Sequence, residues 1–194
     1  MLAERGDEVL SLIRNPEHAD AVREAGAEPV VCDLEQASAD EVAGAIESAD
    51  AVVFAAGAGP GSGSERKETM DYGGAVKLIA AAKDAGIRRY VMVSSLGADP
   101  EAEGDDTFAV YLRAKGKADA ELAGSGLDHT IVRPGRLTDE PGTGLVQVGE
   151  SVSRAEVPRD DVAAVLVATL RESSTVGRSF GVVSGDTPVD EAFG

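Results

Sequence analysis

Three polar side chains near the middle of the sequence have the types and spacing for proton transfer. Tyr111 and Lys115 are four residues apart in a segment that reads as a helix, so the phenol and the ammonium share one face. Ser95 follows a short apolar run, Tyr90 to Val93, that predicts a buried strand. An ammonium beside a phenol favours the phenolate and lowers its pKa, which suits a side chain that gives or takes a proton. We therefore expect Ser95, Tyr111 and Lys115 to form a catalytic group.

Strands alternate with helices on both sides of this group. The sequence predicts strands over residues 9–13, 29–32, 51–55, 90–93, 129–132, 145–148 and 179–183. It predicts helices over residues 17–25, 39–46, 69–85, 108–123 and 159–170. This alternation is typical of an α/β fold with a doubly wound parallel sheet, in which ligands bind beyond the carboxyl ends of the strands. We expect one domain over residues 1–194.

Composition excludes several classes of protein. The chain has 194 residues and a formal net charge of −17, so it lacks the basic face with which proteins neutralise nucleic-acid phosphates. One cysteine, Cys32, and two distant histidines give neither an internal disulfide nor a metal-ligand cluster. No apolar run reaches the roughly 20 residues of a membrane span, and the charged N-terminus is unlike a signal peptide. We expect a cytoplasmic monomer or weak homodimer that takes a small-molecule substrate.

A glycine-rich run follows the third predicted strand, with glycines at positions 57, 59, 61 and 63. The spacing does not fit the dinucleotide fingerprint, because Ser62 stands where that pattern needs a glycine, and no acid follows about 20 residues later. We interpret the run as a loop whose small residues let the backbone lie close to a bound adenosine. A flexible surface loop is the alternative.

Five segments together resemble the atypical short-chain dehydrogenases/reductases. These are small NAD(P)H-binding oxidoreductases similar to flavin reductase/biliverdin reductase B and to the NmrA-like NAD(P)-binding proteins. The resemblance extends over nearly the whole chain, and the segments that carry it are residues 12–16, 88–95, 111–115, 126–138 and 158–162.

The resemblance implies an adenosine end of the site. Arg14 would pair with the 2′-phosphate of NADP, and NAD is less favoured because no acid competes at this strand end. A solvated surface arginine is the alternative. Asp33 and Leu34 would border the adenine ring, although Asp33 can equally cap the turn that follows its strand. The loop near the adenine ribose would comprise Ala55, Ala56 and Gly57.

It also implies a nicotinamide end. Lys115 would hold the nicotinamide ribose hydroxyls and Tyr111 would protonate a carbonyl, with Ser94 as the alternative to Ser95. The turn at Pro134 and Gly135 would meet the carboxamide.

Two nearby arginines have two interpretations from the sequence. Arg133 and Arg136 can bind an acidic group of the substrate, or they can pair with Asp139 and Glu140.

The implied activity is an NADPH-dependent reductase of a small carbonyl, quinone or flavin-like substrate. In such an enzyme the nicotinamide carries the redox chemistry and the protein orients it and adjusts pKa values. A non-catalytic NmrA-like sensor of NADP is one alternative, and a relative of the sugar-nucleotide epimerases and dehydratases is another.

The first residues predict an incomplete Rossmann-type sheet. Leu2 to Gly6 reads as the last turn of a helix closed by a glycine cap. A dinucleotide-binding sheet also needs a first strand, a glycine-rich turn and the start of that helix, together about 15–20 residues. We expect this strand to belong between the strands at 9–13 and 51–55, and we expect the chain as given to bind NADP weakly and to be marginally stable.

Overall fold

The computed structural model describes residues 1–59 and 61–193. The strands are β1 (Leu10–Ile13), β2 (Glu28–Val31), β3 (Ala51–Phe54), β4 (Arg89–Val93), β5 (Asp128–Pro134), β6 (Arg136–Thr138), β7 (Leu145–Gly149), β8 (Glu156–Pro158), β9 (Arg178–Ser184) and β10 (Thr187–Pro188). The helices are α1 (Ala19–Glu24), α2 (Ala39–Ile46), α3 (Gly63–Arg66), α4 (Ala75–Asp84), α5 (Thr107–Ala123) and α6 (Arg159–Arg171). A π-helical segment, Lys67–Gly74, joins α3 to α4.

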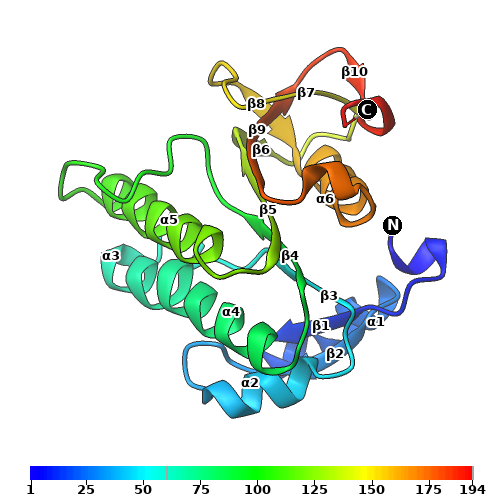
Figure 1. Cartoon of the computed structure of the whole chain (residues 1–194), viewed down its shortest axis with the longest axis vertical. Coiled ribbons are helices and arrows are strands. Elements are labelled where there is room, and N and C mark those ends of the chain that lie inside the picture. The colour runs from blue at the N-terminus through cyan, green and yellow to red at the C-terminus, as the bar shows by residue number, and fades with distance from the viewer. Residues whose placement is uncertain (60, 194) are drawn as a thin grey trace.

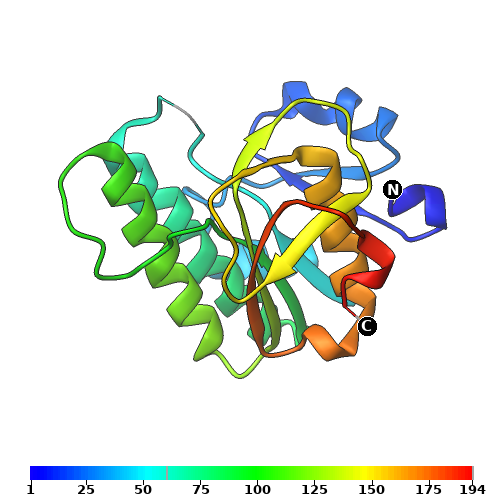
Figure 2. The ribbon, with the colours of Figure 1, turned by 90° about the horizontal axis from the view of Figure 1, so that it is seen from above.

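A six-stranded sheet forms the centre of the molecule, with strand order β10-β7-β9-β5-β4-β3. The β3–β4, β4–β5 and β5–β9 pairs are parallel, whereas β7 and β10 pair antiparallel at the far edge. Helices α2, α4 and α5 lie on one face of this sheet and α6 lies on the other, as both views show (Figures 1 and 2). This is the α/β layering that the sequence predicts.

Two hydrophobic cores fill the spaces between these layers, because strand side chains alternate between the faces of a sheet. In β4, Tyr90 and Met92 join the core under α2, α4 and α5, whereas Val91 joins the core under α6. In β5, Ile131 and Val132 divide in the same way. The central strands are therefore buried on both faces, which fixes their carboxyl ends where α5 begins.

The first two strands form a separate parallel sheet. β1 pairs with β2 over four residues, Leu10 to Ile13 against Glu28 to Val31. Among the described residues, neither β1 nor β2 is paired with β3, although the alternation alone would place all of them in one sheet. The separation falls where the expected additional strand would belong, and that strand stays a prediction. Gly6 closes the turn before β1 in the left-handed conformation, as its sequence position indicates.

Several boundaries differ from those that the sequence predicts. The helix expected over 69–85 begins earlier, at α3, and includes the π-helical segment. Three short strands, β6, β8 and β10, were not predicted. Within the described part of the chain, none of the helices has the length and apolar character that crossing a bilayer requires.

Candidate functional site

The predicted catalytic side chains meet at the carboxyl end of β4. Asp106 caps α5 by accepting hydrogen bonds from the backbone amides of Phe108 (2.9 Å) and Ala109 (3.1 Å), which sets where the helix begins. One and two turns later, Tyr111 and Lys115 face the sheet. The Lys115 Nζ donates to the carbonyl of Val93 at 3.1 Å and lies 6.0 Å from the centre of the Tyr111 ring.

The third predicted member, Ser95, comes from the loop that follows β4. Its hydroxyl lies beside the Tyr111 phenol and acts to lower the phenol pKa. This loop returns over α5 at Gly116, where an added Cβ atom would lie 2.2 Å from backbone atoms of Asp99 and Pro100. Only glycine allows so close an approach, and it brings the Asp99 amide to the Leu112 carbonyl at 3.2 Å. The structure thus brings Ser95, Tyr111 and Lys115 together.

Two further charged residues of this group come from the π-helical segment, and the sequence analysis did not identify them. Asp71 is 1% exposed; it lies 3.4 Å from Lys115 Nζ and accepts a hydrogen bond from the Ala58 amide at 3.2 Å. Lys67 is also buried, donates to the Gly59 carbonyl at 2.8 Å and lies 5.4 Å from the centre of the Tyr111 ring. No motif in the sequence singles out Asp71 or Lys67.

Burial dominates the electrostatics of the group. It raises the Tyr111 pKa above the ordinary value, because a phenolate is poorly solvated there; the carboxylates of Asp71 and Asp119 add to this, and Ser95 opposes it. The expectation that the lysine lowers the Tyr111 pKa is therefore wrong in its net direction. Burial lowers the Lys115 pKa as well, although Asp71 opposes this shift. Burial thus favours the neutral forms of both Tyr111 and Lys115.

Ser94 takes a structural position rather than a place beside the phenol. It is buried next to the Asp119 carboxyl group on α5, and burial raises the pKa of that carboxyl while Ser94 and Arg133 oppose the rise. Arg133 lies 2.9 Å from Asp119, so it pairs neither with Asp139 nor with Glu140. Arg133 is occupied by this inward ion pair.

Arg136 is also paired, but with a residue that the sequence did not suggest. Its guanidinium contacts Glu156 of β8, while Asp139 pairs with Arg159 at 2.7 Å. The predicted pairing of Arg133 and Arg136 with Asp139 and Glu140 is therefore wrong. The short strands β6 and β8 place these side chains, and neither strand was predicted.

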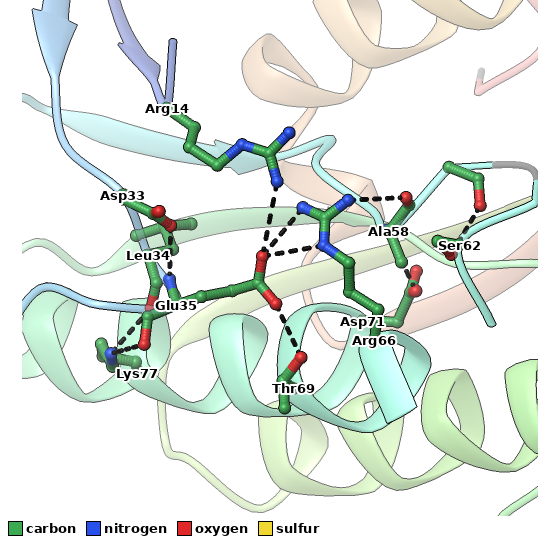
Figure 3. A network of polar contacts seen from close by, with 11 residues as sticks. Arg14, Asp33, Leu34, Glu35, Ala58, Ser62, Arg66, Thr69, Asp71 and Lys77 are labelled. Carbon is green, nitrogen blue, oxygen red and sulfur yellow. Dashed lines mark hydrogen bonds and ion pairs between the residues drawn. The ribbon is translucent and has the colours of Figure 1, made fainter. Parts of the chain in front are cut away.

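Arg14 belongs to a polar network around Glu35 (Figure 3). The Glu35 carboxylate accepts hydrogen bonds from Arg66 at 2.8 and 3.0 Å and from the Thr69 hydroxyl at 2.6 Å, and Arg14 Nη1 lies 3.7 Å from the same carboxylate. Arg66 and Thr69 hold the Glu35 pKa below its usual range. The Arg14 side chain remains 56% exposed. The end of β1 itself carries no acid, but Glu35, in the turn after β2, would compete with a phosphate for Arg14.

The other residues predicted for the adenosine end follow β2 and β3. The Asp33 side chain accepts a hydrogen bond from the Glu35 amide at 2.9 Å, so it caps its own turn. Leu34 is buried in the core, and its carbonyl accepts from Lys77 at 2.7 Å. By contrast, the residues after β3 are accessible to solvent: Ala55 and Gly57 are exposed and Ala56 is half-buried. Of the glycine-rich run, position 60 lies outside the described residues.

A cavity of about 450 Å³ opens beside Ser95, and Pro134 and Gly135 line it. Gly135 is required there, since a Cβ atom would lie 2.1 Å from the Ala155 carbonyl oxygen. Its amide donates to the Val182 carbonyl at 2.9 Å, and the Pro134 carbonyl accepts from the Leu96 amide at 3.0 Å. The Gly135 amide and the Pro134 carbonyl are thus both engaged within the fold.

These residues fit a nicotinamide dinucleotide. Arg14, Gly57 and Ser95 all follow the carboxyl ends of parallel strands, where α/β sheets bind such cofactors. The cavity at Ser95 and Gly135 gives room for a flat ring at one end, and the exposed Arg14 guanidinium offers a charge for phosphate at the other.

Comparison with known proteins shows the family of the chain. The profile of the NAD(P)H-binding family matches residues 1–173. A Bacillus subtilis relative named as an uncharacterized sugar epimerase, YhfK, is 41% identical over 185 residues, which cover 95% of this chain and 86% of the relative.

Solved structures are similar over the whole described fold. One from Bacillus halodurans, named as a candidate NAD-dependent epimerase/dehydratase, matches with a TM-score of 0.90 and 41% identity over 99% of this chain and 89% of that one. The oxidoreductase ylbE from Lactococcus lactis matches with a TM-score of 0.83 and 27% identity over 99% of this chain and 86% of that one. The chain belongs to the NAD(P)H-binding family and has its Rossmann-type α/β fold.

Proposed function

We propose that the protein is an NADPH-dependent reductase of a small carbonyl, quinone or flavin-like compound. The observation that carries this proposal is the convergence of Tyr111, Lys115 and Ser95 beside a cavity at the carboxyl end of β4. Membership of the NAD(P)H-binding family supports a nicotinamide cofactor, which supplies a hydride when bound.

The residues of the chain would manage the proton. Because burial raises its pKa, the Tyr111 phenol is protonated at neutral pH and can donate its proton to the substrate oxygen as the carbon accepts hydride. The Ser95 hydroxyl, beside the phenol, would orient that oxygen. The Lys115 ammonium stabilises the phenolate that remains, and Tyr111 regains a proton from water. Asp71 and the Val93 carbonyl keep the ammonium in place.

The proposed preference for NADPH rests on Arg14. Its exposed guanidinium lies at the end of β1, and a guanidinium recognises phosphate oxygens in pairs. Arg66 pairs with the same Glu35 oxygen as Arg14 and adds a second positive charge to this end of the site (Figure 3).

The names of two relatives favour a second candidate, an epimerase that acts on a sugar. Such an enzyme removes a hydride and returns it, so it consumes no cofactor. Incubation with nucleoside-diphosphate sugars, followed by NMR, separates the candidates: an epimer formed without net NAD(P)H oxidation would favour the epimerase. An NADP sensor of the NmrA type would bind the cofactor and catalyse neither reaction.

Replacing Tyr111 by phenylalanine tests the reductase directly. At saturating NADPH, turnover with quinones, flavins and aldehydes should fall by about 10²- to 10⁴-fold, the usual contribution of a positioned acid. The dissociation constant for NADPH should stay the same, because the ring remains.

Tyr72→Phe is the matched control. Tyr72 lies on the π-helical segment, and its hydroxyl hydrogen-bonds Glu121 of α5 at 3.2 Å on the exposed side of these two elements. Its turnover should equal that of the wild type. If Tyr111→Phe turns over as fast as the wild type, the proposed acid is wrong. If NADPH binds and no electron acceptor is reduced, the result favours an NADP sensor over a reductase.

A further inference from the structure

The cavity beside Ser95 has a positive charge that pairs with no carboxylate of residues 1–59 and 61–193. Two arginines and one glutamate line it: Arg136, Arg154 and Glu156. Arg136 is paired with Glu156, whereas Arg154 has no ion pair with any of the residues 1–59 and 61–193. This is unexpected in a protein with 35 acidic and 18 basic residues, in which a free guanidinium readily finds a partner.

Arg154 is held against the catalytic loop. A Cβ atom at Gly97 would lie 3.0 Å from Nη2 of Arg154, so the guanidinium packs on the backbone two residues after Ser95. Gly97 also has a positive φ of 83°, a backbone conformation that glycine adopts without the steric cost that other residues meet. The residue is exposed to solvent, and its guanidinium lies over the loop that carries Ser95.

The rest of the cavity wall is apolar. Leu96, Pro134 and Ala155 contribute to it, and Phe108 stands at its edge on the first turn of α5. Phe108 is 56% exposed, and its ring stacks on Tyr111 with centroids 6.1 Å apart and an interplanar angle of 29°. An exposed phenylalanine on the catalytic tyrosine is a surface on which a flat ring can stack.

We infer that the substrate of this site is a flat, apolar carbonyl compound that bears a carboxylate, with the ring on Phe108 and the carboxylate on Arg154. This rests on the proposed reductase function, since it names the substrate class of that site. A planar guanidinium binds a carboxylate through two parallel hydrogen bonds. Arg136, Arg154 and Glu156 give the cavity wall one net positive charge, which one bound monoanion neutralises. A phosphate dianion would leave one negative charge uncompensated beside Glu156.

Binding of three matched probes tests the inference without cofactor and without turnover. The probes are 2-naphthoate, 2-naphthamide and 2-naphthyl phosphate, which share one ring system and differ in charge. Calorimetric titration of the full chain should give naphthoate the tightest binding, about tenfold tighter than naphthamide, the discrimination expected of one charge-assisted pair. Because no probe carries a reducible carbonyl, the result is independent of whether the protein is a reductase.

Three variants assign the effect to residues. Arg154→Gln should weaken naphthoate about tenfold, to the affinity of naphthamide, and leave naphthamide unchanged. Phe108→Leu should weaken both probes by the same factor and keep their ratio. Arg178→Gln is the matched control, because Arg178 is exposed at the opposite end of β9 from the site and has no ion pair in the described chain; it should change nothing. Thermal midpoints verify that each variant folds.

Four results would overturn the inference. They are equal affinity for naphthoate and naphthamide, tightest binding of the phosphate, full naphthoate affinity in Arg154→Gln, and no binding of any probe at millimolar concentration.

Discussion

At the scale of single residues, Arg14 shows how a predicted binding group changes meaning once its neighbours are known. The guanidinium is exposed as a phosphate ligand needs, but the Glu35 carboxylate lies 3.7 Å away and Arg66 already donates to that carboxylate. Arg14, Arg66 and Glu35 together carry one net positive charge, and Asp33 in the same turn as Glu35 adds one negative charge. Glu35 would fix the directions of the two guanidinium groups toward a 2′-phosphate.

We expect NADPH to bind more tightly than NADH, and Arg14→Ala to weaken NADPH about tenfold while leaving NADH almost unchanged, as the loss of one charge-assisted contact predicts. Equilibrium titration of NADPH fluorescence measures both constants. Arg23→Ala is the control, since Arg23 forms only a surface pair with Asp20 on α1. Equal losses for NADPH and NADH would contradict the assignment of Arg14.

At the scale of elements, the position of the loop after β4, which carries Ser95, depends on one glycine in α5. The backbone of Asp99 and Pro100 lies where a side chain at Gly116 would be. Glycine inside a helix costs about 1 kcal/mol relative to alanine, so its presence mid-helix is explained by this approach.

Gly116→Ala should therefore lower the free energy of unfolding by about 1–3 kcal/mol, despite the better helix propensity of alanine, because the loop must move away. Gly44→Ala in α2 is the matched control: nothing lies within 4 Å of its added Cβ, so it should raise the free energy of unfolding by about 0.5–1 kcal/mol. Urea denaturation measures both. A stabilised Gly116→Ala variant would show that the loop does not need this contact.

The elements also show what local sequence determines. The bounds of α2 agree with the prediction, because Ser38 and Glu41 form a capping box that marks its start. The π-helical segment was missed because its shape depends on the contacts that Asp71 makes with Ala58 and Lys115, which are distant in sequence. The strands β6 and β8 have three residues each, too few to show a period, and pair mainly with one another. Arg154 was missed for the same reason, since its place depends on that pairing.

At the scale of the whole molecule, acidic charge is the dominant property. The ion pairs are mostly exposed, so each adds little to stability, and a net charge of −17 leaves the carboxylates repelling one another across the surface.

Added salt should therefore stabilise the fold, because it screens the repulsion between charges that are farther apart than the screening length. This length is about 10 Å at 0.1 M and shorter at higher concentration. The thermal midpoint at pH 7 should rise between low and molar NaCl. Near pH 4.4, where the sequence is isoelectric, the same addition should have little effect. A midpoint that stays flat or falls with salt at pH 7 would contradict this explanation.

The division of the strands between two sheets gives a bound dinucleotide a mechanical role. Arg14, Asp33 and Leu34 follow the strands of the two-stranded sheet, whereas Ser95, Tyr111 and Lys115 follow or face the six-stranded one. Within the described chain no backbone ladder joins β1 and β2 to the larger sheet; side-chain packing and the hydrogen bonds of Glu35 and Lys77 hold them to it. A ligand that spans both ends is then a non-covalent cross-link between the two sheets. The affinity of the cofactor depends on how often the β1–β2 sheet opens locally. A change that suppresses this opening should therefore also lower the dissociation constant of the cofactor.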